Sequence, residues 1–182
     1  MPSIATIVID MLNPYDHEDA EPLVEQVKSR IEPIRGLVEA TLDHDDAELI
    51  YVNDNYEDYT ATSKDLGESA MNGRHPELVE PILPPKGTHF LQKVRHSAFY
   101  STALDHLLRE RGIGTLVLAG QVTEQCILYS ALDAYVRSFD VRIPEDAVAP
   151  IDPDLGDAAL RMMKSNMGAE IVPAADALAV PT

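Results

Sequence analysis

The sequence is poor in cysteine and in residues that could form a leader or membrane anchor. Cys126 is the single cysteine among 182 residues, so no disulfide can form within the chain and a disulfide-stapled secreted scaffold is excluded. The first residues, Met1 to Thr6, lack the basic start and long apolar run of a secretory signal. No apolar run approaches membrane-spanning length. We therefore expect a cytoplasmic protein that does not associate with membrane.

Basic residues are also scarce. Lys and Arg number 14 against 31 Asp and Glu, which gives a formal net charge of −17. Nucleic acids and anionic membranes bind basic surfaces, so neither is expected as a partner. The acidity instead favours a soluble, self-repelling surface. With 45% hydrophobic residues, the chain can build an ordinary core, and its length suits one domain over residues 1–182.

Several common site motifs are missing. The six histidines do not fall into metal-ligand spacing, alone or with Cys126. There is neither a glycine-rich phosphate loop nor the G-x-S-x-G turn of a serine hydrolase. We therefore expect no metal and no cofactor, and a small molecule remains the most plausible ligand.

Short apolar runs alternate with helical patterns along the chain. Runs that are apolar on both sides are typical of buried parallel strands, and they occur at 4–9, 47–52, 88–93, 115–119, 141–143 and 170–172. Helical spacing occurs at 21–42, with a kink or a division into two helices expected at Pro33, and at 101–111, 124–137 and 155–167. The polar segment 56–86 is expected to be a long connection with one or two short helices. This alternation predicts an α/β sandwich with a mostly parallel sheet.

Three chemically reactive side chains follow predicted strands. Ligands of parallel sheets bind beyond the carboxyl ends of the strands, where Asp10, Lys93 and Cys126 all fall. Thr123 is expected to cap the next helix, which places Cys126 in a first turn whose dipole and amides favour a thiolate and a developing oxyanion. Asp10 could then accept the thiol proton, and Lys93 could hold Asp10 ionised or stabilise the thiolate.

Each of these residues also has an ordinary interpretation. A lone cysteine is often a small buried hydrophobic residue, an aspartate at a strand end often caps the next turn, and most lysines are solvated. A redox-sensing thiol would lack a resolving partner, because there is no second cysteine. Only the three residues together indicate a catalytic site.

The motifs around these residues resemble the isochorismatase-like cysteine hydrolases, which include nicotinamidases, N-carbamoylsarcosine amidases and ureidoacrylate hydrolases. The similarity covers nearly the whole chain. It rests on three segments in the same order as in the family, namely Ile9-Asp10-Met11, Lys93-Val94-Arg95-His96-Ser97-Ala98-Phe99-Tyr100 and Gly120-Gln121-Val122-Thr123-Glu124-Gln125-Cys126.

The resemblance implies a single-domain, Rossmann-like sandwich with a six-stranded, mostly parallel sheet and helices on both faces. It implies a catalytic triad of Asp10, Lys93 and Cys126. It also implies a cis peptide at Gln121–Val122, which would aim the amide of Val122, with that of Cys126, at the oxyanion. The family's pocket walls correspond to Tyr15, Asn55 and Tyr56, and its members form homo-oligomers.

Two departures narrow the expected chemistry. Nicotinamidases carry a metal-binding Asp-x-His, whereas this chain has Asp54-Asn55-Tyr56, with tyrosine in place of the histidine. Isochorismatases generally lack the nucleophilic cysteine. The resulting hypothesis is a metal-independent cysteine hydrolase that cleaves a C–N bond of a small amide, ureide or carbamoyl compound through a thioester. The alternatives are a catalytically silent binding or assembly module, and an isochorismatase-type hydrolase of another metabolite.

Overall fold

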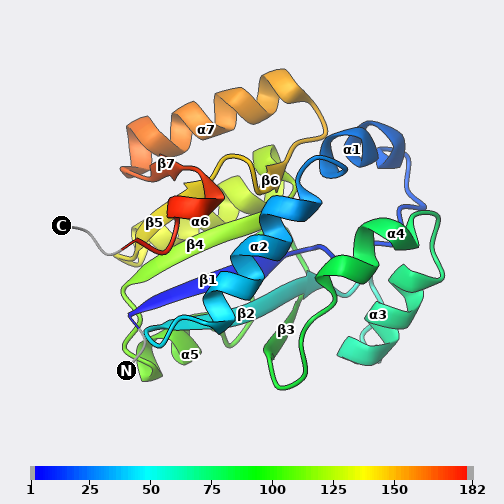
Figure 1. Cartoon of the computed structure of the whole chain (residues 1–182), viewed down its shortest axis with the longest axis horizontal. Helices are drawn as coiled ribbons and strands as arrows, with labels where there is room; N and C mark the ends of the chain where they lie inside the picture. The colour runs from blue at the N-terminus through cyan, green and yellow to red at the C-terminus, as the bar shows by residue number, and fades with distance from the viewer. Residues whose placement is uncertain (1–2, 180–182) are drawn as a thin grey trace.

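One parallel sheet runs through the protein. The computed structural model describes residues 3–179 (Figure 1). Within them the strands are β1 (Ile4–Ile9), β2 (Ala47–Asp54), β3 (His89–Lys93), β4 (Thr115–Gln121), β5 (Asp140–Pro144), β6 (Val148–Ala149) and β7 (Glu170–Val172). The strand order is β3-β2-β1-β4-β5-β7, with β6 paired to the end of β4. Every pairing is parallel, as the sequence predicts.

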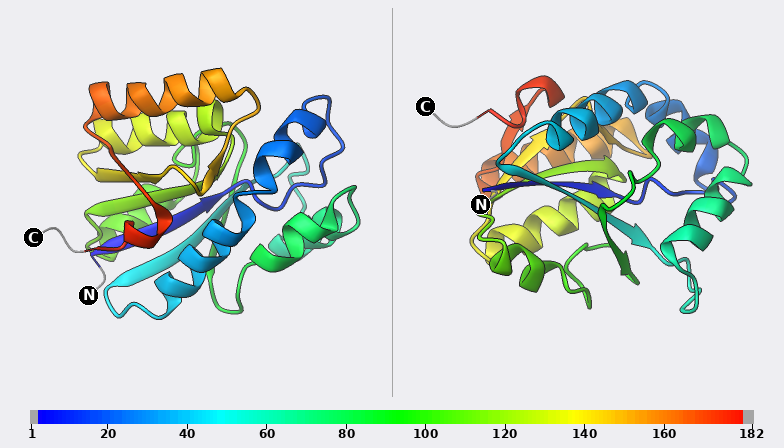
Figure 2. Two further views of the ribbon diagram at one scale, coloured as in Figure 1. Left: turned by 45° about the horizontal axis from the view of Figure 1, so that its top comes forward. Right: turned by 60° about the horizontal axis from the view of Figure 1, so that its bottom comes forward.

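Helices cover both faces of this sheet (Figure 2). One face packs against α1 (Ala20–Val27), α2 (Ile31–Leu42), α3 (Ser63–Met71), α4 (Pro76–Val79) and the short turns η1 (Glu80–Ile82) and η3 (Ala174–Asp176). The other packs against α5 (Leu104–Glu110), η2 (Thr123–Ile127), α6 (Leu128–Val136) and α7 (Pro153–Met167). Alternate residues of β1 serve the two layers, with Ile4 and Val8 on one side and Ala5, Ile7 and Ile9 on the other. The expected three-layer α/β fold is therefore confirmed.

The sheet holds seven strands in the described residues, where six were expected. The additional strand is β6, which has two residues and gives no periodic signal in the sequence. The helical stretch 21–42 is indeed two helices, but the break lies at residues 28–30 and not at Pro33. Pro33 is the third residue of α2, where its missing N–H costs no intrahelical bond.

The helix predicted at 124–137 begins differently from the expectation. Its first turn, η2, is π-helical, and the regular helix α6 starts only at Leu128. Ile127 and Ala131 are buried, as expected. Leu132 and Tyr135, which were also expected to point inward, are 45% and 48% exposed, and Ala134 is buried instead.

No helix within residues 3–179 combines the length and the apolar character needed to span a membrane.

The close approach of β1 and β4 at the carboxyl end of their pairing requires a glycine. Gly120 pairs with Ile9, has a φ of 112°, and would place a Cβ atom 2.2 Å from the Ile9 carbonyl oxygen. We expect Gly120→Ala to lower the free energy of unfolding by about 3 kcal/mol, because it adds a backbone clash to an unfavourable φ. Chemical denaturation checks this. Gly114→Ala is the matched control, since no atom lies within 4 Å of its added Cβ. Equal midpoints for the two variants would contradict the prediction.

Candidate active site

The sheet brings three predicted residues to one edge. Asp10 directly follows β1, Lys93 is the last residue of β3, and Cys126 lies in η2 just after β4. Because β1 lies between β2 and β4, and β3 pairs with β2, the carboxyl ends of these strands meet. Asp10 leaves its strand with a φ of 56°, and its amide still donates to Val52 of β2. The backbone of β1 and β2 thus fixes where the carboxylate points.

One buried ammonium group connects the site. The Nζ atom of Lys93 lies 2.9 Å from Oδ2 of Asp10, 3.2 Å from Oδ2 of Asp54 and 3.6 Å from Sγ of Cys126. The Lys93 side chain is only 1% exposed. The other carboxylate oxygen of Asp10 accepts a hydrogen bond of 2.7 Å from the Asp54 amide. The lysine is therefore surrounded by the two carboxylates and the thiol.

Burial and charge determine the protonation of these groups. Burial raises the pKa of Asp10, and this outweighs the opposing charge of Lys93. Burial, together with the negative charge of Asp10, raises the pKa of the Cys126 thiol. Burial alone would lower the pKa of Lys93, but its interactions with Asp10, Cys126 and Asp54 raise it overall. Lys93 therefore stays an ammonium, and the raised pKa values of Asp10 and Cys126 both favour their protonated forms.

The turn before Cys126 differs from the expected capped helix. Thr123 does not cap the helix: η2 begins after Val122, no side chain caps it, and the Thr123 hydroxyl oxygen is buried without a partner in the described structure. A backbone hydrogen bond with Val122 lowers the pKa of the Cys126 thiol, but burial and the charge of Asp10 outweigh it, so the pKa is raised overall and not lowered as expected. The Gln121–Val122 peptide bond is cis, at the position that the resemblance implies.

The Gln121 side chain holds the first loop against this turn. Its Nε2 atom donates to the Asp10 carbonyl oxygen at 2.7 Å, and its Oε1 atom accepts from the Tyr15 hydroxyl at 3.3 Å. These bonds join the residue just before the Val122 amide to Asp10 and to Tyr15, on the loop that follows β1. The sequence assigned no role to the Gln121 side chain, because such a contact depends on the tertiary fold.

A cavity of about 590 Å³ opens onto the thiol. Its walls come from the loop after β1, the ends of β2 and β3, and the turn after β4; they comprise Asp10, Asn13, Pro14, Asp16, His17, Asp19, Leu23, Asp54, Tyr56, Ser69, Lys93, Gln121, Val122, Gln125, Cys126 and Ile151. All three expected triad residues and both expected oxyanion residues are among them. The cavity thus gives a small molecule direct access to Cys126.

Of the three expected pocket residues, only Tyr56 lies on this wall. Tyr15 is fully buried behind it, where its hydroxyl is bonded to Gln121 and its ring meets that of His75 edge-on. Asn55 is also buried, and its side-chain oxygen accepts from the Glu57 amide. The structure therefore places Tyr15 and Asn55 behind the cavity, where they support its walls.

Two neighbours of Asp10, Lys93 and Cys126 were missed in the sequence. Asp54 had been noted only as the remnant of a metal motif, yet it pairs with Lys93. His96 follows Lys93 by three residues, and its Nδ1 atom lies 3.7 Å from the Cys126 sulfur. The His96 side chain is exposed and does not line the cavity. The position of Asp54 at the end of β2 is the one signal that could have identified it, because Asp10 has the same position at the end of β1.

The residues at Asp54-Asn55-Tyr56 do not fit a metal ion. The Asp54 carboxylate forms an ion pair with Lys93, and the Tyr56 hydroxyl donates to the Leu12 carbonyl oxygen at 3.0 Å. Among residues 3–179, no three His, Cys, Asp or Glu side chains are grouped to hold a metal. A reaction without metal remains a prediction.

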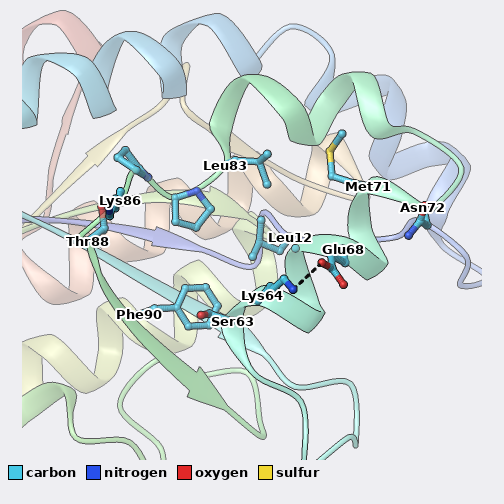
Figure 3. Close-up of a pocket in the computed structure, with 14 residues that line it drawn as sticks. Leu12, Ser63, Lys64, Glu68, Met71, Asn72, Leu83, Lys86, Thr88 and Phe90 are labelled. Atoms are coloured by element: carbon cyan, nitrogen blue, oxygen red, sulfur yellow. Dashed lines mark ion pairs between the residues drawn. The ribbon is translucent and has the colours of Figure 1, made fainter.

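A second cavity, of about 660 Å³, lies between α3 and the segment 83–90 (Figure 3). Its walls include Leu12, Met71, Leu83 and Phe90, and the ion pair between Lys64 and Glu68 (3.3 Å) lies at its edge. Its described walls contain neither cysteine nor histidine. Residues from both ends of α3 and from the segment before β3 therefore shape this second cavity, whereas Tyr56 and Ser69 are the described residues of the connection that reach the cavity at Cys126.

The comparison with known proteins agrees with this geometry. The isochorismatase domain matches residues 5–176. The chain belongs to the isochorismatase family. It is 32% identical over 167 residues to an uncharacterised isochorismatase family protein of Bacillus subtilis. The aligned region covers 92% of this chain and 92% of that protein.

Solved structures of family members have the same fold. The nicotinamidase of Bacillus subtilis is 30% identical, with a TM-score of 0.72, covering 93% of this chain and 99% of that one. The N-carbamoylsarcosine amidase of Thermoplasma acidophilum is 31% identical, with a TM-score of 0.73 and coverage of 96% and 97%. The protein is therefore an isochorismatase-family hydrolase, related to nicotinamidase and carbamoylsarcosine amidase.

Proposed function

We propose that this hydrolase is a metal-independent cysteine amidohydrolase that cleaves a C–N bond of a small amide, ureide or carbamoyl compound. The observation that carries the proposal is the contact of Lys93 with both Asp10 and Cys126, at 2.9 and 3.6 Å, on the wall of one cavity. The names of the related nicotinamidase and N-carbamoylsarcosine amidase support a bond of the amide type.

In the first half of the reaction, Asp10 accepts the proton of the Cys126 thiol as the sulfur attacks the substrate carbonyl carbon. The backbone amides of Val122 and Cys126 donate to the oxyanion that forms. The C–N bond then breaks while Asp10 returns the proton to the departing nitrogen. Ammonia or an amine leaves, and the acyl group remains on Cys126 as a thioester.

In the second half, Asp10 accepts a proton from water while the water oxygen attacks the thioester carbon. The C–S bond breaks, and Cys126 regains a proton as the acid product leaves. Lys93 keeps its charge throughout and offsets the negative charge that moves between Asp10 and Cys126. The raised pKa of the thiol supports this scheme, because Cys126 then keeps its proton until Asp10 accepts it during the attack on the substrate.

His96 is the competing proton acceptor for Cys126. It lies 3.7 Å from the sulfur, but its exposed side chain is outside the cavity wall, whereas Asp10 is buried on that wall. An acceptor must also return its proton to the substrate nitrogen, so a position on the cavity wall favours Asp10. We therefore assign the proton transfers to Asp10.

The pH dependence separates these two acceptors. The reactive form of Asp10 and Cys126 has lost one proton in total, so kcat/KM falls in acid when the pair gains a second proton. Because burial raises the pKa of Asp10, we expect this acid limb above the ordinary aspartate pKa of 3.8. Because the thiol pKa is raised, we expect the alkaline limb above 9.0. His96→Gln should retain both limbs, whereas Asp10→Asn should lose the acid limb with a fall of about 10³-fold in kcat/KM. Loss of the acid limb in His96→Gln alone would assign the base to His96.

A reversible block of the thiol tests the proposed function. Ammonia release is measured on a panel of small amides, ureas and carbamoyl amino acids, before and after treatment with methyl methanethiosulfonate. Cys126 is the single cysteine, so the reagent blocks one site, and dithiothreitol restores it. We expect turnover of at least one compound, its loss on blocking and its return on reduction. Absence of turnover across the panel, together with slow reaction of Cys126 at neutral pH, would favour a binding module instead.

A further inference from the structure

The cavity at Cys126 has an excess of negative charge. Its walls carry four carboxylates, Asp10, Asp16, Asp19 and Asp54, and one ammonium, Lys93. With His17 neutral, the formal charge of these walls is 1 − 4 = −3. The whole chain, these walls included, carries a net charge of −17, so the surrounding field does not reverse this local sign.

The one ammonium on these walls is already engaged. Lys93 is 1% exposed and contacts both Asp10 and Asp54. No arginine lies on the described walls of the cavity. A carboxylate on a substrate would therefore find no free cation there, and it would face the acidic side chains at close range.

Two of the four carboxylates lie where an incoming substrate would meet them first. Asp16 and Asp19 are exposed residues of the loop between β1 and α1, and they lie on the cavity wall. Within residues 3–179 neither forms an ion pair, and Asp19, which precedes α1, makes no side-chain capping bond. The nearby loop residue Arg74 is directed to Glu21, at 3.9 Å. The charges of Asp16 and Asp19 are thus free to act on a ligand.

We propose that the cavity selects substrates that carry an ammonium or other cationic nitrogen at the end remote from the reacting carbonyl, and that it disfavours substrates that carry a carboxylate. Asp16 and Asp19 are the specificity-determining residues, because their unpaired carboxylates attract a cation at the cavity mouth. The selection applies to the cavity itself, and its role in hydrolysis rests on the proposed function.

The test uses the reactivity of Cys126 and needs no turnover. Rates of modification are measured with 2-aminoethyl methanethiosulfonate, which is cationic, and 2-sulfonatoethyl methanethiosulfonate, which is anionic. Each rate is divided by the rate of the same reagent with free cysteine. At low ionic strength we expect the cationic reagent to be favoured by about tenfold or more, and we expect added salt to reduce this ratio.

Matched variants locate the effect. Asp16→Asn combined with Asp19→Asn is expected to lower the ratio about fivefold, as the loss of two exposed charges allows. Asp43→Asn combined with Asp45→Asn removes two exposed carboxylates from the loop before β2, at the other end of the sheet, and should leave the ratio unchanged. If Asp19 serves only the start of α1, its loss would lower the unfolding midpoint without changing the ratio.

Turnover separates this inference from the proposed function. Among β-alaninamide, propionamide and succinamate, kcat/KM should fall in that order, from cation to neutral to anion. A reagent ratio near one, or one that favours the anion, would overturn the inference even if amides are hydrolysed. A cationic ratio of tenfold with no Cys126-dependent ammonia release from any amide would support the inference and contradict the proposed function.

Discussion

Cys126→Ala is expected to lower kcat by about 10⁴-fold or more, because it removes the atom that forms the thioester. Cys126 is small and 7% exposed, so alanine leaves little empty space and the fold should persist. Cys126→Ser provides the sharper comparison, because it keeps a nucleophilic oxygen in place of the sulfur. A hydroxyl holds its proton far more tightly than a thiol does, so Asp10 should not activate it, and we expect a similar loss.

The measurement is steady-state ammonia release on a substrate found in the panel, with thermal unfolding to show that both variants remain folded. The competing account has water attack the substrate directly, as in an isochorismatase-type hydrolase of another metabolite. That account requires no thiol. Retention of more than about one tenth of the wild-type kcat in folded Cys126→Ala would therefore remove Cys126 from the mechanism and favour direct attack by water.

Lys93→Met is expected to lower the free energy of unfolding by about 3–5 kcal/mol at neutral pH, and to abolish activity. The methionine fills most of the lysine volume, but Asp10 and Asp54 lose the ammonium that lies 2.9 and 3.2 Å from them. The two carboxylates would then face each other in a largely buried site. Lys64→Met is the control, because Lys64 is 80% exposed and its loss should change stability by less than about 0.5 kcal/mol.

The sign of the pH dependence identifies the cause. Burial raises the pKa of Asp10, and loss of the opposing charge of Lys93 should raise it further above the unfolded value, so the folded state favours its protonated form. The stability deficit should therefore be smallest below about pH 4 and should grow as the pH rises above the ordinary aspartate range. Lys93→Met combined with Asp54→Asn should recover part of the loss at neutral pH. A deficit that is constant with pH would indicate a packing defect, and the charge account would then be wrong.

The sequence predicted the parts of the site that depend on strand ends. Asp10, Lys93 and Cys126 each follow or end an apolar run, and in a parallel sheet those positions converge. The same alternation of strands and helices predicted the layers, and the motifs around these residues indicated the family. These inferences succeed because local periodicity and chain order determine them.

Other features depend on contacts between distant segments. The ion pair between Asp54 and Lys93 and the burial of Tyr15 behind Gln121 follow from how the loops pack, which periodicity does not encode. The π turn at η2 was missed because a pattern of 3.6 residues assumes a regular helix from its first turn. The inward face of α6 was also predicted incorrectly at Leu132 and Tyr135, because the small residues Ala131 and Ala134 pack against the sheet and these larger ones do not.

The covalent state of Cys126 during turnover tests the central claim most directly. The enzyme is mixed with excess substrate, quenched in acid from milliseconds to seconds, and digested, and the mass of the peptide that contains Cys126 is followed. The account predicts a transient mass increase equal to the acyl part of the substrate, located on Cys126 and absent from Cys126→Ser at this position. Product formation with the Cys126 peptide unmodified at every time would contradict it.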